Sequence, residues 1–264
     1  MLLTSVIIIL REVLEAALLL SILLALSRTL SIKFRWLYWA AGMGLVGAVG
    51  YGLSMRTVSN TLDGVGQEVV NAMMQLSIYV CLIWLCHLFV RCSLTAATMT
   101  SRQSAVMGYI VVLLTIREGS EIFVYLSGFS HTPGVNQGLI VGSLIGAGIG
   151  LSISVLFYFI LLSFKPQRVL WIGCSLLTLV GAGMCLQSSQ LLIQADWLPA
   201  QHPVWDSSAV LSESSILGQV LYALVGYETR PTPLQLAIYI SSLSIMTVLL
   251  YLTNRYWQQR GQSE

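Results

Sequence analysis

Two copies of one charged pattern, Arg-Glu-x-x-Glu, interrupt long apolar stretches of the chain. Their charged residues are Arg11, Glu12, Glu15, Arg117, Glu118 and Glu121. On an α-helix the charged positions of one copy fall within an arc of about 100°, so they share one face. Carboxylates are the oxygen ligands that hard cations prefer, and two glutamates three residues apart can both reach one ion. The two copies therefore predict a cation site with four carboxylate ligands.

The arginines are expected to pair with these carboxylates. In each copy the arginine can reach the glutamate one turn further along, which joins Arg11 to Glu15 and Arg117 to Glu121. Such pairing limits repulsion in the empty site and weakens cation binding enough for release. The alternative is a pair of salt-bridged clusters that only fix helix packing. Two copies in matching places favour cation binding over that alternative.

The composition places these charges inside a membrane. Hydrophobic residues make up 56% of the 264 residues and charged residues only 9%, whereas an ordinary globular protein has about 25% charged residues. A soluble chain of this length cannot cover its surface with so few charges, which excludes a soluble enzyme, a nucleic-acid binder and a disordered scaffold. A charge at the bilayer centre costs about 2.5–3.5 kcal/mol, so the pattern charges must face one another, water or an ion.

Seven apolar runs are long enough to cross a bilayer, since a spanning helix needs about 20 residues. They are residues 3–27, 36–55, 68–90, 104–127, 137–162, 168–194 and 234–254. The predicted fold class is an all-α integral membrane protein with seven transmembrane helices. The chain, residues 1–264, is expected to form a single transmembrane domain.

The distribution of Lys and Arg predicts the orientation of these spans. Nine of the 13 basic residues fall on one side of the predicted membrane, and the positive-inside rule makes that side the cytoplasm. The N-terminus is then outside and the C-terminus in the cytoplasm. Six of the 11 acidic residues fall on the outer side, where an acidic face would raise the local concentration of cations. The alternative is that the outer loops simply lack basic residues.

The charged patterns lie in the first and fourth spans, which indicates a duplication. The span that follows each pattern is rich in glycine, and in the fifth span the glycines recur at Gly138, Gly142, Gly146 and Gly150. Small residues at this spacing let helices approach closely. Repeat one covers about 1–92 and repeat two about 104–194, followed by an outer loop, 195–233, and the seventh span. Three spans per repeat invert the second copy, and transporters with inverted repeats place their sites near the midplane.

Together these patterns resemble the oxidase-dependent iron permease family, which includes fungal high-affinity iron permeases and bacterial Efe-type ferrous iron permeases. The hallmark of that family is R-E-G-L-E in the first and fourth spans, and this chain reads R-E-V-L-E and R-E-G-S-E. A later stretch from Trp205-Asp206 to Gly226-Tyr227 and Pro231 resembles the bacterial branch. The resemblance covers the whole chain in order and topology.

This resemblance implies a permease that imports iron across the cytoplasmic (inner) membrane. The metal ligands that it implies are Glu12, Glu15, Glu118 and Glu121. Iron, as Fe²⁺ or Fe³⁺, is then the transported substrate, with no permanently bound cofactor. The family also implies a separate ferroxidase or metal-binding partner on the outer side, and the outer loop is a candidate place for it to dock.

The sequence also allows alternative interpretations of the substrate and of the function. Bacterial relatives often carry a His-Glu pair and another acid at the end of span six, whereas this chain has Gln190-Leu191 and Gln194. That departure leaves lead or another divalent metal as an alternative substrate. A membrane assembly or sensor subunit, whose buried charges pair with a partner, is an alternative of another class. No H-E-x-x-H or G-x-S-x-G pattern is present, so an enzyme is not expected.

Two further features lie on the predicted outer side. Glu68 opens the third span and is a tentative relay carboxylate on the ion path; the alternative is an acid favoured by the helix dipole. The outer loop contains a short amphipathic stretch with a single apolar face, formed by Ile216, Leu217, Val220, Leu221, Leu224 and Val225. Ser212 or Ser214 could cap its start. We expect this stretch to lie on the outer surface or to cap the bundle.

Overall fold

The computed structural model describes residues 2–95, 101–129 and 136–261, and these are mostly helical. A short 3-10 helix, Leu62–Gly64, precedes α3. The α-helices are α1 (Leu2–Thr29), α2 (Arg35–Ser59), α3 (Gly66–Thr95), α4 (Ser101–Phe129), α5 (Asn136–Leu162), α6 (Pro166–Gln194), α7 (Ile216–Val225) and α8 (Pro233–Gly261). Each of the seven predicted spans lies within one of the long helices, so the prediction of these helices is confirmed.

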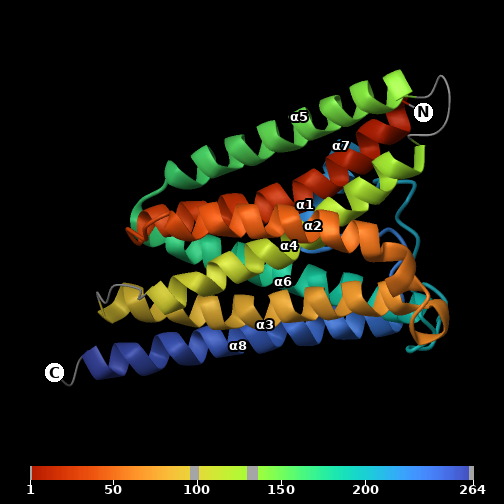
Figure 1. Ribbon diagram of the computed structural model, residues 1–264. Coiled ribbons are helices and arrows are strands. Elements are labelled where there is room, and N and C mark those ends of the chain that lie inside the picture. Colours follow the sequence, from red (N-terminus) through yellow and green to blue (C-terminus); the bar gives the residue numbers. More distant parts are fainter. Residues whose placement is uncertain (1, 96–100, 130–135, 262–264) are drawn as a thin grey trace.

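The seven long helices run along a common direction and alternate in sense from one to the next (Figure 1). The helices α1, α3, α5 and α8 begin at one end of the bundle, which we call the N-terminal end. The helices α2, α4 and α6 begin at the opposite end, where α8 finishes, which we call the C-terminal end. Long helices that follow one another in the chain are therefore antiparallel.

Four of the helices are long and apolar enough to cross a membrane. Their apolar segments are Gly66–Leu94, Gln137–Leu162, Pro166–Gln194 and Pro233–Tyr256. The helices α1 and α4 differ from these four because each carries the three charges of one pattern within its apolar stretch. In α2, glycine and aromatic residues lower the mean hydropathy. These three helices are nevertheless 28, 25 and 29 residues long, and about 20 residues suffice to span the hydrocarbon core.

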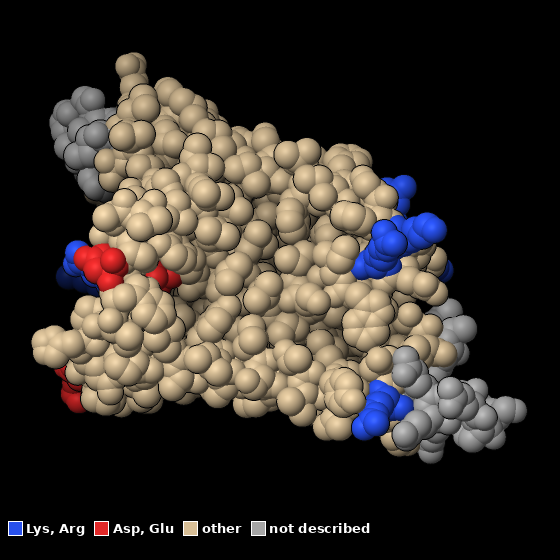
Figure 2. Space-filling view, turned by 180° about the vertical axis from the view of Figure 1, so that it is seen from behind, with Lys and Arg blue, Asp and Glu red and all other residues tan. Residues whose placement is uncertain are grey.

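On the face seen in Figure 2, charged side chains lie at the two ends of the bundle and none lies across the middle. Asp and Glu lie at the N-terminal end, and Lys and Arg lie at the C-terminal end and beside the acidic residues at the N-terminal end. One exposed ion pair at the N-terminal end joins Arg230 Nη2 to Asp206 Oδ2 at 2.7 Å. The side chains of Arg102 and Arg260, and the whole of Glu264, lie outside the described residues.

The packing has the same form in the two halves of the chain. The helix α1 packs along α5, and α4 packs along α2 in the same manner; α1 also contacts α6, as α4 contacts α3. If α1 is exchanged with α4, α2 with α5 and α3 with α6, the same pairs of helices are in contact. The remaining long helix, α8, packs outside this arrangement against α3 and α6.

Glycines make the two closest helix pairs possible. A Cβ atom on Gly146 of α5 would lie 2.5 Å from the backbone oxygen of Val6 on α1. A Cβ atom on Gly44 of α2 would lie 2.7 Å from Thr115 Cβ on α4. The predicted role of glycine in close approach is thus confirmed, except at Gly138 of α5 and at Gly42 and Gly50 of α2, where no neighbouring atom lies within 4 Å of the Cβ position.

The helix α7 corrects the prediction for the outer loop. It does not lie flat on the surface, because it packs between α1 and α6 inside the bundle. Its buried residues are Gly218, Gln219, Tyr222 and Ala223. Of the predicted apolar face, Val220 and Leu224 pack against the buried leucines of α1, whereas Ile216 and Leu217 are 57% and 60% exposed. The cap is Ser215, whose side chain accepts a hydrogen bond from the Gly218 amide, and not Ser212 or Ser214.

An apolar core fills the half of the bundle that leads to the C-terminal end. Its buried side chains come from all seven long helices, and the fully buried ones include Leu19, Ile22, Leu26, Ile78, Leu82, Leu85, Phe89, Met107, Ile110, Leu114 and Leu177. The buried charges therefore lie toward the N-terminal end of the bundle, and the apolar core lies toward the C-terminal end.

We predict that Gly146→Ala destabilises the protein by about 1–3 kcal/mol, because the added methyl group forces α1 and α5 apart. The matched control is Gly148→Ala on the same helix, where no atom lies within 4 Å of the Cβ position. Thermal unfolding of the purified protein in detergent measures both variants. Equal melting temperatures for the two variants would contradict the close approach of α1 and α5.

Candidate metal site

The two charged patterns face each other across the contact between α1 and α4. Both lie near the middle of their helices, so the side chains meet well inside the bundle. Glu12 and Glu15 on α1 are 7% and 6% exposed, and Glu118 on α4 is 2% exposed. Carboxylates buried to this degree need charged partners or a bound cation.

Three of the four predicted ligands converge on one point. One carboxylate oxygen from each of Glu12, Glu118 and Glu121 lies within 4.8 Å of the other two. A hard cation holds its oxygen ligands at about 2.0–2.6 Å, so two ligands of one ion can lie apart by up to twice that distance. The three oxygen atoms, which lie within 4.8 Å of one another, are within this range. We call these three residues the carboxylate triad. The triad draws on both patterns and can hold one cation with little movement of the helices.

The fourth predicted ligand, Glu15, has a different environment. Its Oε2 atom accepts a hydrogen bond from Arg117 Nη1 at 3.2 Å, and its Oε1 atom lies 3.5 Å from Arg11 Nε. Glu15 therefore joins the arginines of the two patterns and lies outside the triad. The structure thus brings three of the four predicted ligands together and pairs the fourth with arginine side chains.

Arg117 lies at the centre of the cluster. Its guanidinium group donates hydrogen bonds to Glu15 and Glu118, and its Nε atom lies 3.9 Å from Glu121 Oε1. Only 7% of its side chain is exposed. A guanidinium group among several carboxylates offsets much of their mutual repulsion. Both predicted arginine–glutamate pairs are present, and Arg117 also makes two pairs that the helical spacing did not indicate.

Arg11 occupies a more open position than Arg117. Its side chain is 41% exposed, and its Cζ atom lies 4.0 Å from the centre of the Tyr222 ring. The attraction between a guanidinium group and an aromatic face holds Arg11 against α7. The two arginines therefore differ in role, since Arg117 compensates the carboxylates and Arg11 connects the cluster to α7. Sequence spacing gave no signal for Tyr222, because it belongs to the distant outer loop.

Neutral polar residues border the triad on the side of α2 and α3. The Asn71 amide donates a hydrogen bond to Glu121 Oε1 at 3.4 Å, and the Tyr51 hydroxyl donates to Asn71 Oδ1 at 3.1 Å. Glu68, one turn before Asn71, does not belong to the triad. The three-residue spacing of Glu68 and Asn71 in the first turns of a largely apolar helix is a sequence signal that could have identified Asn71.

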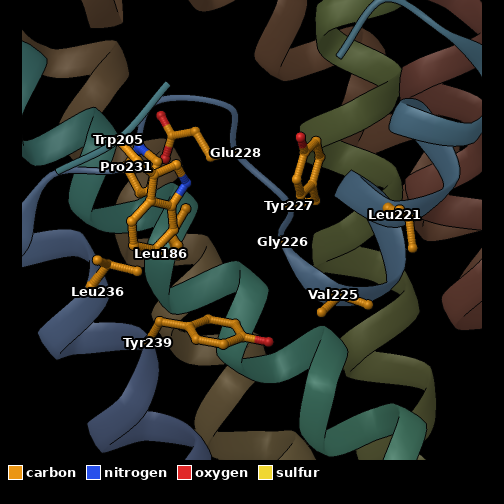
Figure 3. A pocket seen from close by; sticks show the side chains of 10 residues that line it. All are labelled: Leu186, Trp205, Leu221, Val225, Gly226, Tyr227, Glu228, Pro231, Leu236 and Tyr239. Atoms are coloured by element: carbon orange, nitrogen blue, oxygen red, sulfur yellow. The ribbon is translucent and has the colours of Figure 1, made fainter. Parts of the chain in front are cut away.

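The loop residues around α7 form a separate, mainly apolar cavity of about 320 Å³. Figure 3 shows Trp205, Tyr227 and Tyr239 around it, with Glu228 at its edge. Burial raises the pKa of Glu228 above its usual range. In contrast, hydrogen bonds from Ser208 and Arg230 hold the pKa of the exposed Asp206 well below its usual range. One carboxylate in an apolar cavity is not a multidentate cation site, so the triad remains the candidate.

Comparisons with known proteins identify the family. No curated protein and no solved structure matches the chain. A family model does match it, over residues 2–260. The family is one of permeases, which are transporters and not enzymes, and the apolar helices fit a multi-pass membrane protein. The resemblance carried by the two charged patterns is thereby confirmed: the chain belongs to the iron permease FTR1 family.

Proposed function

We propose that this chain imports iron across the cytoplasmic membrane and binds the ion, ferrous or ferric, at the carboxylate triad. The observation that carries this proposal is the convergence of Glu12, Glu118 and Glu121 from the two patterns. Anionic oxygen ligands suit hard cations such as ferric iron and are also used for ferrous iron. Family membership supports iron as the substrate, and the buried carboxylates support the place of binding.

The proposed architecture has seven membrane spans, α1 to α6 and α8, arranged as two inverted repeats and one extra helix. The exchange symmetry of the helix packing supports the repeats α1–α3 and α4–α6. The lengths and alternating directions of the helices support the number of spans. The basic C-terminal end supports a cytoplasmic position for that end, which leaves the N-terminus outside.

Arg117 sets the strength of cation binding in this proposal. In the arrangement described above, its guanidinium group already holds Glu15 and Glu118. An arriving cation competes with that group for the same oxygens, so its net binding is weaker than four free carboxylates would give. Weaker binding favours release, which transport requires. Glu15 becomes available as a further ligand when Arg117 moves away from it.

The apolar core determines what must happen after the ion binds. A hydrated cation cannot pass the close-packed side chains between the triad and the C-terminal end. Release to the cytoplasm therefore requires a movement that opens this half of the bundle. In transporters with inverted repeats, the rocking of one repeat against the other supplies such a movement.

Two alternatives are less well supported. A membrane assembly or sensor subunit would keep its buried charges for a partner, but here Glu15, Arg117 and Glu118 pair within the chain. A permease of the same architecture for lead or another divalent metal would use the same carboxylates. Uptake of lead but not iron by the natural chain would favour that alternative. The outer-side ferroxidase or metal-binding partner stays a prediction of the family resemblance.

We predict that Glu12→Gln, Glu118→Gln and Glu121→Gln each lower the initial rate of iron uptake at least about tenfold. Each substitution removes a negative charge from a buried cation site, and the loss of one charged ligand is worth about 1.5–3 kcal/mol. The measurement is uptake of radioactive iron into proteoliposomes that contain equal amounts of each variant. Natural rates in all three variants would contradict the proposed site.

The matched control for this experiment is Asp196→Asn, at the N-terminal end of the bundle. It also replaces a carboxylate by an amide, but Asp196 is exposed and lies outside the cluster. Its uptake rate should equal that of the natural chain. A loss as large as that of the triad variants would show that general surface charge, and not the triad, sets the rate.

We predict that Arg117→Gln lowers both the maximal uptake rate and the iron concentration that gives half of it. Without the guanidinium group the carboxylates bind the ion more tightly, and tighter binding slows release. A change of about threefold to tenfold in each quantity corresponds to the loss of one charged hydrogen-bond pair. Unchanged values of both would contradict competition between Arg117 and the ion.

A further inference from the structure

A row of polar side chains follows one face of α3 from its first turn to the level of the triad. Glu68, Asn71 and Gln75 are three and four residues apart, so they lie on the same face of the helix. The row extends about 10 Å along the helix axis. Asn71 is 2% exposed and Gln75 is 0% exposed. Beyond Gln75 the face becomes apolar, with Ile78 and Leu82 fully buried in the core.

Asn71 connects this row to the carboxylate triad. Its Nδ2 atom donates to Glu121 Oε1 at 3.4 Å, while its Oδ1 atom accepts from the Tyr51 hydroxyl at 3.1 Å. Glu68 lies one turn before Asn71 on the same face of α3. Polar side chains therefore follow one another from Glu68, near the start of α3, to the triad.

Two oxygen atoms of this row are buried without a hydrogen-bond donor in the described part of the chain. They are Glu68 Oε2 and Gln75 Oε1. The other end of the Gln75 amide donates to Gln187 Oε1 on α6 at 2.6 Å, which fixes the side chain in place. A buried acceptor without a donor is unfavourable, and a cation satisfies it directly. An amide that served only to join α3 to α6 would not need to keep a free oxygen.

We propose that Glu68, Asn71 and Gln75 form a relay site, which receives a partly hydrated divalent cation at the N-terminal end of the bundle and passes it to Glu121. This site rests on the function proposed above, because it supplies the route to the triad. One carboxylate attracts the ion, and neutral amide oxygens replace some of its water without holding it strongly. The apolar face beyond Gln75 leaves the triad as the next place where a cation can bind.

The test is ferrous iron uptake into proteoliposomes, with the half-saturating concentration and the maximal rate measured separately. We expect Asn71→Ala to raise the half-saturating concentration about fivefold, the loss expected for one neutral ligand. Asn71→Asp keeps an oxygen ligand but lacks the N–H group that ties Asn71 to Glu121. The relay site therefore predicts that Asn71→Asp stays within about twofold of the natural chain.

The matched control is Asn254→Ala on α8, which removes a buried, unpartnered amide oxygen outside the row. Its half-saturating concentration should be that of the natural chain. A half-saturating concentration for Asn71→Ala equal to that of the natural chain would overturn the relay site. So would an Asn71→Asp variant as impaired as Asn71→Ala, since that result indicates a purely structural amide. If neither Asn71 variant inserts, Glu68→Gln replaces them, with the same rise expected and an unchanged value overturning the proposal.

Different experimental results would contradict the relay site and the function proposed for the triad. If Glu118→Gln abolishes uptake while the row variants leave it unchanged, the triad stands and the relay site falls. If the natural chain carries no iron, or Glu118→Gln carries it at the natural rate, the function of the triad fails first.

Discussion

Charge balance in an apolar interior is the constraint on which the rest of this structure depends. Four glutamates and two arginines meet inside the bundle, and a lone charge there is strongly unfavourable. Arg117 pairs with three of the carboxylates, and Arg11 reaches Glu15 on one side and Tyr222 on the other. The six side chains still carry a formal charge of −2. That surplus is what a transported cation neutralises, so the same balance explains both stability and binding.

The surrounding fold can be understood as the means of bringing two charged helices together. Glycines on α2 and α5 allow α4 and α1 to pack against them with little separation, and this holds the patterns face to face. The packing of α1 to α3 matches that of α4 to α6, but α7, α8 and the apolar core depart from this symmetry. Polar groups reach the triad from the N-terminal end, whereas close-packed apolar side chains fill the path to the C-terminal end. Polar side chains on one side of the site and a close-packed apolar barrier on the other are what one state of an alternating transporter requires.

Much of this arrangement could be predicted from the sequence because charges in apolar helices have few places to go. The facing patterns, both arginine–glutamate pairs and the close glycine contacts follow from helical periodicity. The separate environment of Glu15 could not be predicted, since spacing within α1 does not show which arginine of α4 approaches it. Tyr222 was missed because the apolar face of α7 suggested a surface helix. Its small buried residues, Gly218 and Ala223, instead let α7 pack inside the bundle.

Iron is proposed to bind between α1 and α4 at Glu12, Glu118 and Glu121. The sharpest test of this placement is an experimental structure of the iron-loaded protein, with the metal located by its anomalous scattering. We expect one strong metal peak within about 2.0–2.6 Å of an oxygen atom from each of these residues. We also expect the Arg117 guanidinium group to be displaced from Glu118. A metal peak elsewhere, with Arg117 still bonded to Glu118 and the triad free of metal, would contradict this placement.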